Sequence, residues 1–263
     1  MIRSLFSGGT GMRAQQFNVD IVSNNLSNVN TNGYKRTRAD FEDLFYEHLK
    51  VAGSPSADAA EHPTGISVGM GVRTGATSKV YSQGNARKTE NSLDVMIKGD
   101  GFFQIMQPDG TTAYSRDGAF KMDGDGNLVT SSGLYVQGGD ISIPENATGI
   151  TIRADGTVSA QIQGQEEPEN VGQLELAKFV NPSGLKTIGS NLLKETTASG
   201  SPQVVTPGTE GAGELQQGFI ESSNVDVIEA LTDLIAMQRA YEFNHRTIRT
   251  SDKMLARATT LLQ

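Results

Sequence analysis

The chain has 263 residues, of which 36% are hydrophobic, 30 are glycine and none is cysteine or tryptophan, and its formal net charge is -8. Without cysteine, the chain has no disulfide, no thiolate nucleophile and no zinc–cysteine site. The acidic balance and the lack of a concentrated basic surface argue against nucleic acid as a partner. The apolar content, taken with glycine, is typical of globular chains, and the length allows one large domain or two smaller ones.

The sequence lacks the apolar run of ~18 residues that crosses a bilayer, so we expect no membrane insertion. At the N-terminus, Gly8, Gly9 and Gly11 interrupt any apolar core of a leader. We therefore expect no cleavable signal peptide, and export, if it occurs, by another route.

The first thirty residues repeat an apolar position every seven residues, which places these positions on one face of a helix. This N-terminal stripe consists of Leu5, Met12, Val19, Val22, Leu26 and Val29. The three glycines each cost roughly 1 kcal/mol inside a helix, which predicts a helix that forms mainly when packed. The turn-forming residues 30–33 end the pattern.

Residues 37–80 are predicted to form an extended connecting region. Apolar residues near its start follow a short helical spacing, at Phe41, Leu44, Phe45 and Leu49. The stretch that follows, rich in Gly, Pro and Ser up to Gly65, is typical of an exposed loop or arm.

Residues 81–195 alternate with a period of two and are punctuated by Asp-Gly pairs, which predicts a mainly antiparallel β domain. The clearest hairpin runs from Ile150 to Ile162 around Asp155-Gly156. The predicted core of the β domain consists of Val95, Ile97, Phe102, Phe103, Ile105, Phe120, Leu128, Val129, Val136, Leu174, Leu176 and Phe179.

Residues 196–221 are predicted to form a connecting arm, and residues 222–263 a long helix. The helix is expected to open at Ser222, with Ser223 and Asp226 spaced as a capping box. Its C-terminal stripe consists of Val227, Leu234, Tyr241, Ile248, Leu255 and Leu262. A helix of this length overshoots a compact β domain, so both stripes indicate assembly and not merely a core face.

The sequence offers little chemistry. Residues 123–127 resemble the start of a calcium loop, but Leu128 and Leu134 occupy the positions of its required glycine and glutamate, which favours an ordinary turn. We find no Ser/His/Asp order, metal-ligand cluster or phosphate loop. We therefore expect no enzyme activity, no cofactor and no bound metal.

One segment resembles a known family. Its core residues are similar to the N-terminal signature of the bacterial flagellar rod and hook proteins, at Asn25, Leu26, Ser27, Asn28, Thr31, Gly33, Tyr34 and Lys35. Further matches include Gly99-Asp100-Gly101-Phe102-Phe103, Tyr114-Ser115-Arg116-Asp117-Gly118 and Gln238-Arg239-Ala240-Tyr241-Glu242. The resemblance covers essentially the whole chain and is strongest to the member that forms the distal rod.

The resemblance implies an α+β fold, in which N- and C-terminal axial helices, residues 1–36 and 222–263, form a coiled-coil-like domain with an inserted β domain. It also implies a structural subunit that self-assembles into the helical distal rod, crosses the periplasm in the basal body and transmits torque to the hook. The implied partners are proximal rod proteins, hook protein, P-ring and L-ring proteins, the rod cap and the flagellar type III export apparatus. Two alternatives remain: a proximal rod protein, and a secreted carbohydrate- or calcium-binding β module with oligomerising helices.

Overall fold

A computed structural model of the chain describes residues 2–53, 55–57, 60–61, 63–138, 141–144, 146–163 and 167–260. The chain divides into two compact units. A helical unit comprises residues 1–27, 37–78 and 226–263, and a β unit comprises residues 28–36 and 79–225. Each unit is therefore built from segments that are far apart in the sequence.

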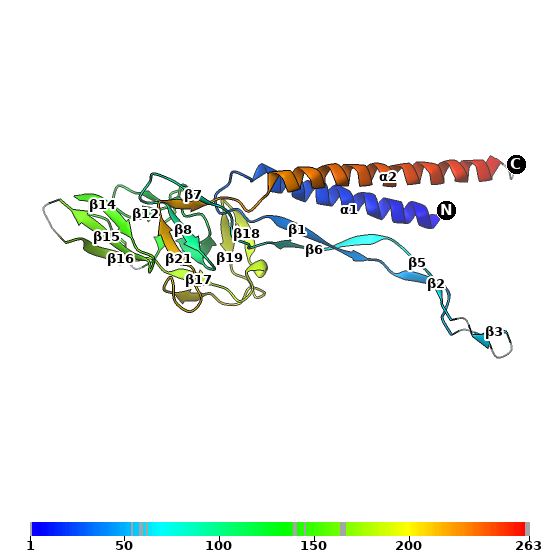
Figure 1. Cartoon of the computed structure of the whole chain (residues 1–263), viewed down its shortest axis with the longest axis horizontal. Helices are drawn as coiled ribbons and strands as arrows, with labels where there is room; N and C mark the ends of the chain where they lie inside the picture. The colour runs from blue at the N-terminus through cyan, green and yellow to red at the C-terminus, as the bar shows by residue number, and fades with distance from the viewer. Residues whose placement is uncertain are drawn as a thin grey trace. The chain divides into compact units, whose positions relative to one another are not determined.

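Two long helices lie side by side in the helical unit, α1 (Ile2–Ser27) and α2 (Val227–Thr260) (Figure 1). The helix α2 begins at Val227 and not at Ser222, because Asp226 caps it: its Oδ1 accepts hydrogen bonds from the backbone N–H of Ile228 at 2.8 Å and of Glu229 at 3.2 Å. The two predicted terminal helices and the antiparallel β region are confirmed.

The remainder of the helical unit is a β ribbon (Figure 1). Its strands pair β1 with β6, β2 with β5 and β3 with β4. The helical spacing near Phe41 is thus carried by strands and not by a helix. The ribbon comprises β1 (Thr37–Asp43), β2 (Tyr46–Lys50), β3 (Pro55–Ala57), β4 (Ala60–Glu61), β5 (Ile66–Gly69) and β6 (Val72–Lys79).

A seven-stranded sheet forms the centre of the β unit. Its order is β18-β19-β10-β9-β17-β20, with β13 also paired to β9. These strands are β9 (Phe102–Met106), β10 (Thr112–Ser115), β13 (Val136–Gln137), β17 (Leu176–Lys178), β18 (Lys186–Gly189), β19 (Leu192–Lys194) and β20 (Gln203–Val205); a short 3-10 helix, η1 (Pro182–Gly184), precedes β18.

Smaller sheets complete the β unit. The hairpin predicted around Asp155-Gly156 is confirmed: Gly156 has φ +85°, and Ile152 pairs with Val158. Residues 196–221 supply three of the unit's strands. The smaller sheets contain β7 (Ala86–Lys88), β8 (Val95–Lys98), β11 (Lys121–Met122), β12 (Leu128–Val129), β14 (Ala147–Ile152), β15 (Thr157–Ile162), β16 (Glu169–Gln173), β21 (Glu214–Gln217) and β22 (Phe219–Glu221).

The period of two explains how β9 supports two cores. Phe103 and Ile105 enter the main cluster, whereas Phe102 enters a second cluster with Tyr114 and Phe179. All the core residues predicted from sequence are buried except Val136, which is half-buried against the main cluster.

Candidate assembly site: terminal helices, β ribbon and buried charge cluster

The helices α1 and α2 pack in an antiparallel register. Ser4 Oγ lies 3.0 Å from Ser251 Oγ. One turn along α1, a Cβ at Gly8 would lie 3.0 Å from Cγ1 of Ile248. The residue numbers rise along α1 while they fall along α2, so the N-terminal end of α1 lies beside the C-terminal part of α2 (Figure 1).

The glycines of α1 differ in what surrounds them. A Cβ at Gly11 would lie 2.9 Å from Nδ2 of Asn244, and one at Gly8 would crowd Ile248. A Cβ at Gly9, in contrast, would meet no atom within 4 Å. Gly8 and Gly11 therefore allow close approach of the two helices, a role that helix propensity alone does not predict.

Most residues of the two apolar stripes lose solvent exposure within a single chain. Val22 is buried, whereas Val227 and Tyr241 stay exposed and Leu262 lies outside the described residues. Val29 follows the end of α1 and belongs to the β unit. Half-buried members are Leu5, Met12, Val19, Leu26, Val29, Leu234, Ile248 and Leu255. Their contacts with other subunits stay a prediction.

A second apolar row runs along α2 and is exposed. Ile228, Leu231 and Ile235 recur at helical spacing, and Ile228 is 76% exposed. Such a row on an isolated helix is unburied apolar surface that a further partner would cover.

The β ribbon also exposes large apolar side chains. Phe45 is 90% exposed, and Tyr46, Leu49, Val51 and Ile66 are exposed as well. Ion pairs lie along the ribbon: Arg73 Nη2 donates to Glu42 at 2.7 Å. Exposed aromatic and aliphatic residues on a two-stranded ribbon, with little core of its own, are typical of a docking element.

The signature residues divide between the two units. In the helical unit, the Asn25 amide pairs with the backbone of Thr37, donating through Nδ2 at 2.8 Å and accepting through Oδ1 at 2.9 Å. In the β unit, Thr31 Oγ1 donates to Asn28 Oδ1 at 3.2 Å. Leu26 is half-buried, and the Ser27 hydroxyl donates to the backbone carbonyl of Ser23. The polar signature residues thus bind backbone and each other.

Gly33 occupies the tightest turn of the signature. Its φ is +65°, and a Cβ there would lie 2.7 Å from the backbone of Arg116. Its N–H donates to the carbonyl of Glu221 at 2.8 Å. Both the positive φ and the close approach therefore require glycine. Beside it, the Lys79 ammonium lies 5.0 Å from the centre of the Tyr34 ring.

A buried ion pair joins the signature to the C-terminal strand of the β unit. Lys35 Nζ donates to Glu221 Oε1 at 2.6 Å and to the carbonyl of Ser82 at 2.8 Å. The same carboxylate oxygen accepts the N–H of Gly84 at 2.8 Å. Burial lowers the pKa of the Lys35 ammonium although Glu221 opposes that shift.

Arg116 completes the buried charge cluster, which we define as Lys35, Arg116 and Glu221. Its Nη2 donates to the carbonyl of Gly99 at 2.7 Å, and its Nε lies 3.8 Å from Glu221 Oε2. Lys35 and Glu221 are 186 positions apart, and no periodic pattern links them. Local sequence patterns therefore do not reveal the role of Glu221, and they mark Arg116 only as part of a motif.

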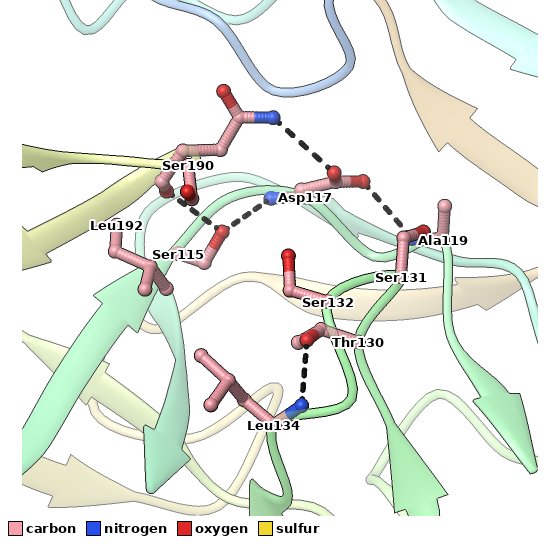
Figure 2. Close-up of a pocket in the computed structure, with 10 residues that line it drawn as sticks. Ser115, Asp117, Ala119, Thr130, Ser131, Ser132, Leu134, Ser190 and Leu192 are labelled. Atoms are coloured by element: carbon pink, nitrogen blue, oxygen red, sulfur yellow. Dashed lines mark hydrogen bonds between the residues drawn. The ribbon is translucent and has the colours of Figure 1, made fainter. Parts of the chain in front are cut away.

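A cavity of about 210 Å³ lies between Asp117 and the hydroxyl groups of Ser115, Ser131 and Ser132 (Figure 2). Asp117 accepts the N–H of Ala119 at 3.1 Å, and burial raises the pKa of its carboxyl group. The Asp117 carboxylate closes a local turn, so we assign it a structural role.

The described residues include neither a metal-binding cluster nor a membrane-spanning helix. They hold no group of three or more His, Cys, Asp or Glu side chains placed to bind a metal ion. Residues 123–127 form the turn between β11 and β12, with Gly126 N–H donating to the carbonyl of Asp123. Neither described helix has the length and apolarity needed to cross a membrane.

Comparisons with known proteins identify the family. Residues 5–35 match the model of flagella basal body rod proteins, residues 96–160 the D1 domain of the flagellar hook proteins FlgE/F/G, and residues 216–261 the C-terminal region of flagellar basal body rod FlgEFG proteins. The flagellar basal-body rod protein FlgG of Buchnera aphidicola subsp. Schizaphis graminum is 51% identical over 99% of this chain and 100% of its own length. The chain belongs to the FlgG family of flagellar basal-body rod proteins.

Other members of the FlgG family are similar over the same extent. The protein from Borreliella burgdorferi is 48% identical over 99% of both chains, and that from Bacillus subtilis is 38% identical over 99% of both. The matched segments include most of α1 with the signature, residues 96–160 of the β unit, and β22 with α2. Similarity therefore extends over both the helical unit and the β unit.

Proposed function

We propose that this chain is a structural subunit of the flagellar distal rod, which self-assembles into a helical tube, crosses the periplasm and transmits torque from motor to hook. The observation that carries the proposal is similarity to FlgG proteins over 99% of the chain. We further propose that this chain contacts proximal rod proteins, the hook protein, the P-ring and L-ring proteins, the rod cap and the export apparatus.

In this proposal, the paired helices form the coiled-coil-like layer of the tube. The intrachain pair α1–α2 covers part of the two stripes, and the exposed stripe residues Val227 and Tyr241 remain for neighbouring subunits together with the row Ile228, Leu231 and Ile235. Dense helix contacts make a shaft stiff because packed interiors resist compression. Torque then passes along the shaft with little twist stored in it.

The row on α2 offers a test in which the monomer stays folded. Ile235 is 53% exposed, so Ile235→Glu should leave the monomer intact but place a charge where a neighbouring subunit packs. We expect the variant to restore neither motility nor rods in a strain lacking the native gene. Thr247→Glu, which introduces the same charge at an exposed position on a different face of α2 from this row, is the control. Normal rods built from a soluble Ile235→Glu chain would refute this packing.

We propose that the β ribbon bridges neighbouring subunits. Among its described residues, large apolar side chains are exposed in the single chain at Phe41, Phe45, Tyr46, Leu49, Val51 and Ile66. Replacing residues 46–69 with a short turn should change rod straightness or length in micrographs of basal bodies. Unchanged rods would show that the ribbon has no bridging role.

A further inference from the structure

A second pocket of the β unit differs from the cavity beside Asp117. It has a volume of about 290 Å³ and combines aromatic walls with basic side chains. Arg116 of the buried charge cluster lines it, and Lys178 stands at its rim, where Nζ donates to the carbonyl of Glu210 at 3.1 Å. Its other walls include the acidic Asp100 and the side chains of Tyr81, Phe102, Phe179 and Val180.

Buried hydrogen-bond donors line this pocket without acceptors. Nε and Nη1 of Arg116 and the hydroxyl of Tyr81 are buried and have no hydrogen-bond partner among the described residues. A small shift could join Nε to Glu221 Oε2, which is 3.8 Å away and also lacks a hydrogen bond. Nη1 and the Tyr81 hydroxyl would still lack acceptors. A buried donor without an acceptor is costly, so this wall favours a ligand that only accepts.

The local charge favours an anion. The pocket lining holds two cations, Arg116 and Lys178, against one carboxylate, Asp100. Asp100 is exposed and acts on both cations of the buried charge cluster, Lys35 and Arg116. Burial lowers the pKa of Arg116 and raises the pKa of Tyr81 to about 12, so the Tyr81 hydroxyl keeps its proton at neutral pH.

The walls define the rest of the ligand. The guanidinium carbon of Arg116 lies 5.5 Å from the centre of the Phe102 ring, which packs edge-on against Tyr81 and Phe179. Val180 is 84% exposed beside them. The aromatic rings and Val180 offer apolar contact to a short aliphatic part of the ligand. The hydrogen-bond donors of Arg116 and Tyr81 are more buried than Val180. The donor atoms are buried in the free chain, so binding requires that the half-buried Tyr81 side chain moves.

We propose that this pocket binds the carboxylate of an aspartate or glutamate side chain from a second copy of this chain. The proposal rests on the proposed function, since a rod places copies of the chain side by side. Acidic side chains are plentiful, with 30 Asp and Glu residues against 22 Lys and Arg. The carboxylate accepts hydrogen bonds from Arg116 Nη1 and from the Tyr81 hydroxyl, and its methylene stem covers Val180.

The binding test uses the soluble full chain and a minimal acidic side chain. N-acetyl-glutamate N-methylamide is titrated while the amide resonances of Gly101 and Val180 are followed by NMR. We expect saturable shifts there, and binding at least about tenfold weaker for the neutral glutamine analogue. Tyr81→Phe, which keeps the ring, should weaken binding by about fivefold. Equal shifts with both probes would overturn the proposal.

A second variant avoids removing any buried group. Val180→Glu places a carboxylate at the mouth of the pocket, within its own chain. We expect it to occupy the site, to abolish shifts caused by the probe and to raise the midpoint of thermal unfolding. Val204→Glu, at an exposed valine of β20 outside this pocket, is the matched control and should do neither. Identical behaviour of the two variants would contradict the proposal.

Assembly separates this proposal from the proposed function. If the unmodified chain polymerises and Val180→Glu lowers the polymerisation rate at least about fivefold relative to Val204→Glu, the second copy is supported as the ligand's source. If both variants polymerise equally although the probe binds, the pocket takes a free carboxylate and the second-copy assignment fails. If the unmodified chain forms no rods under any condition while the probe binds, the proposed function fails and the carboxylate site stands.

Discussion

The helical unit and the β unit bury their apolar residues to very different extents. In the β unit, Phe103, Ile105, Leu174 and Leu176 are fully buried in one continuous cluster. In the helical unit, buried side chains are small or few, and large ones such as Phe45 and Ile228 face solvent. The β unit therefore has a core of its own, whereas the helical unit leaves apolar surface for partners to cover.

This contrast indicates that the β unit determines the stability of the fold and that the helical unit serves assembly. A domain needs a filled core to be stable, which the β unit has. A helix pair with one covered face and one exposed apolar row is stable mainly when further helices join it. Changes in the β unit should thus act on the stability of the chain, and changes in the helical unit on assembly.

The largest effect is expected from the buried charge cluster. Glu221→Ala removes its carboxylate and leaves only the exposed Asp100 to oppose the buried charges of Lys35 and Arg116. We expect a loss of about 3–5 kcal/mol in the free energy of unfolding of the β unit. Hydrogen exchange of the Phe103 and Ile105 amides, which lie in β9, measures that loss selectively.

A neighbouring exposed glutamate supplies the control for that experiment. Glu214→Ala, on the strand β21, should change stability by no more than about 0.5 kcal/mol. If both substitutions had the same small effect, the buried charge cluster would not hold the β unit together.

The helix pair can be tested with two adjacent glycines. Gly9→Ala should stabilise α1 by about 1 kcal/mol, because alanine favours a helix and the new Cβ meets no atom within 4 Å. Gly8→Ala should gain little or nothing, since its Cβ would crowd Ile248 at 3.0 Å. Urea unfolding followed by the helical circular dichroism signal compares the two. Equal stabilisation would show that the close approach at Gly8 is unimportant.

The smallest effect is expected on the pH dependence of stability, to which the Asp117 carboxyl group contributes. Its folded pKa is raised above 3.8 by burial, so its contribution to stability is fully present below pH 3.8 and is lost as pH rises through the folded pKa. The Asp117→Asn variant lacks this dependence, so its stability relative to the unmodified chain should increase with pH.

Asp155 provides the opposite case in the same unit. A hydrogen bond from the Thr157 N–H lowers its pKa below 3.8, so its contribution is present above that value and is lost as pH falls through the folded pKa. The stability of the Asp155→Asn variant relative to the unmodified chain should therefore decrease as pH rises. Thermal unfolding of the three chains between pH 3 and 7 checks both signs, and parallel curves would contradict them.

Local patterns were sufficient for the elements and for most of the core. The heptad stripes indicated both terminal helices, and the alternation around Asp155-Gly156 predicted a hairpin with the observed turn. The start of α2 was placed too early because Ser223 and Asp226 are both good caps, and only the hydrogen bonds of Asp226 show which one acts. The helical spacing near Phe41 did not indicate the observed structure, because pairing of β1 with β6 overrides a weak helical pattern.

The two helices, the β region and the family resemblance could be predicted from the sequence, since periodicity and motifs are properties of neighbouring residues. The folded chain was needed to show that Lys35, Arg116 and Glu221 form one buried charge cluster, and that Gly8 differs from Gly9. Both facts depend on contacts between segments distant in the chain. Burial and close approach arise only when the chain folds, and no local pattern encodes them.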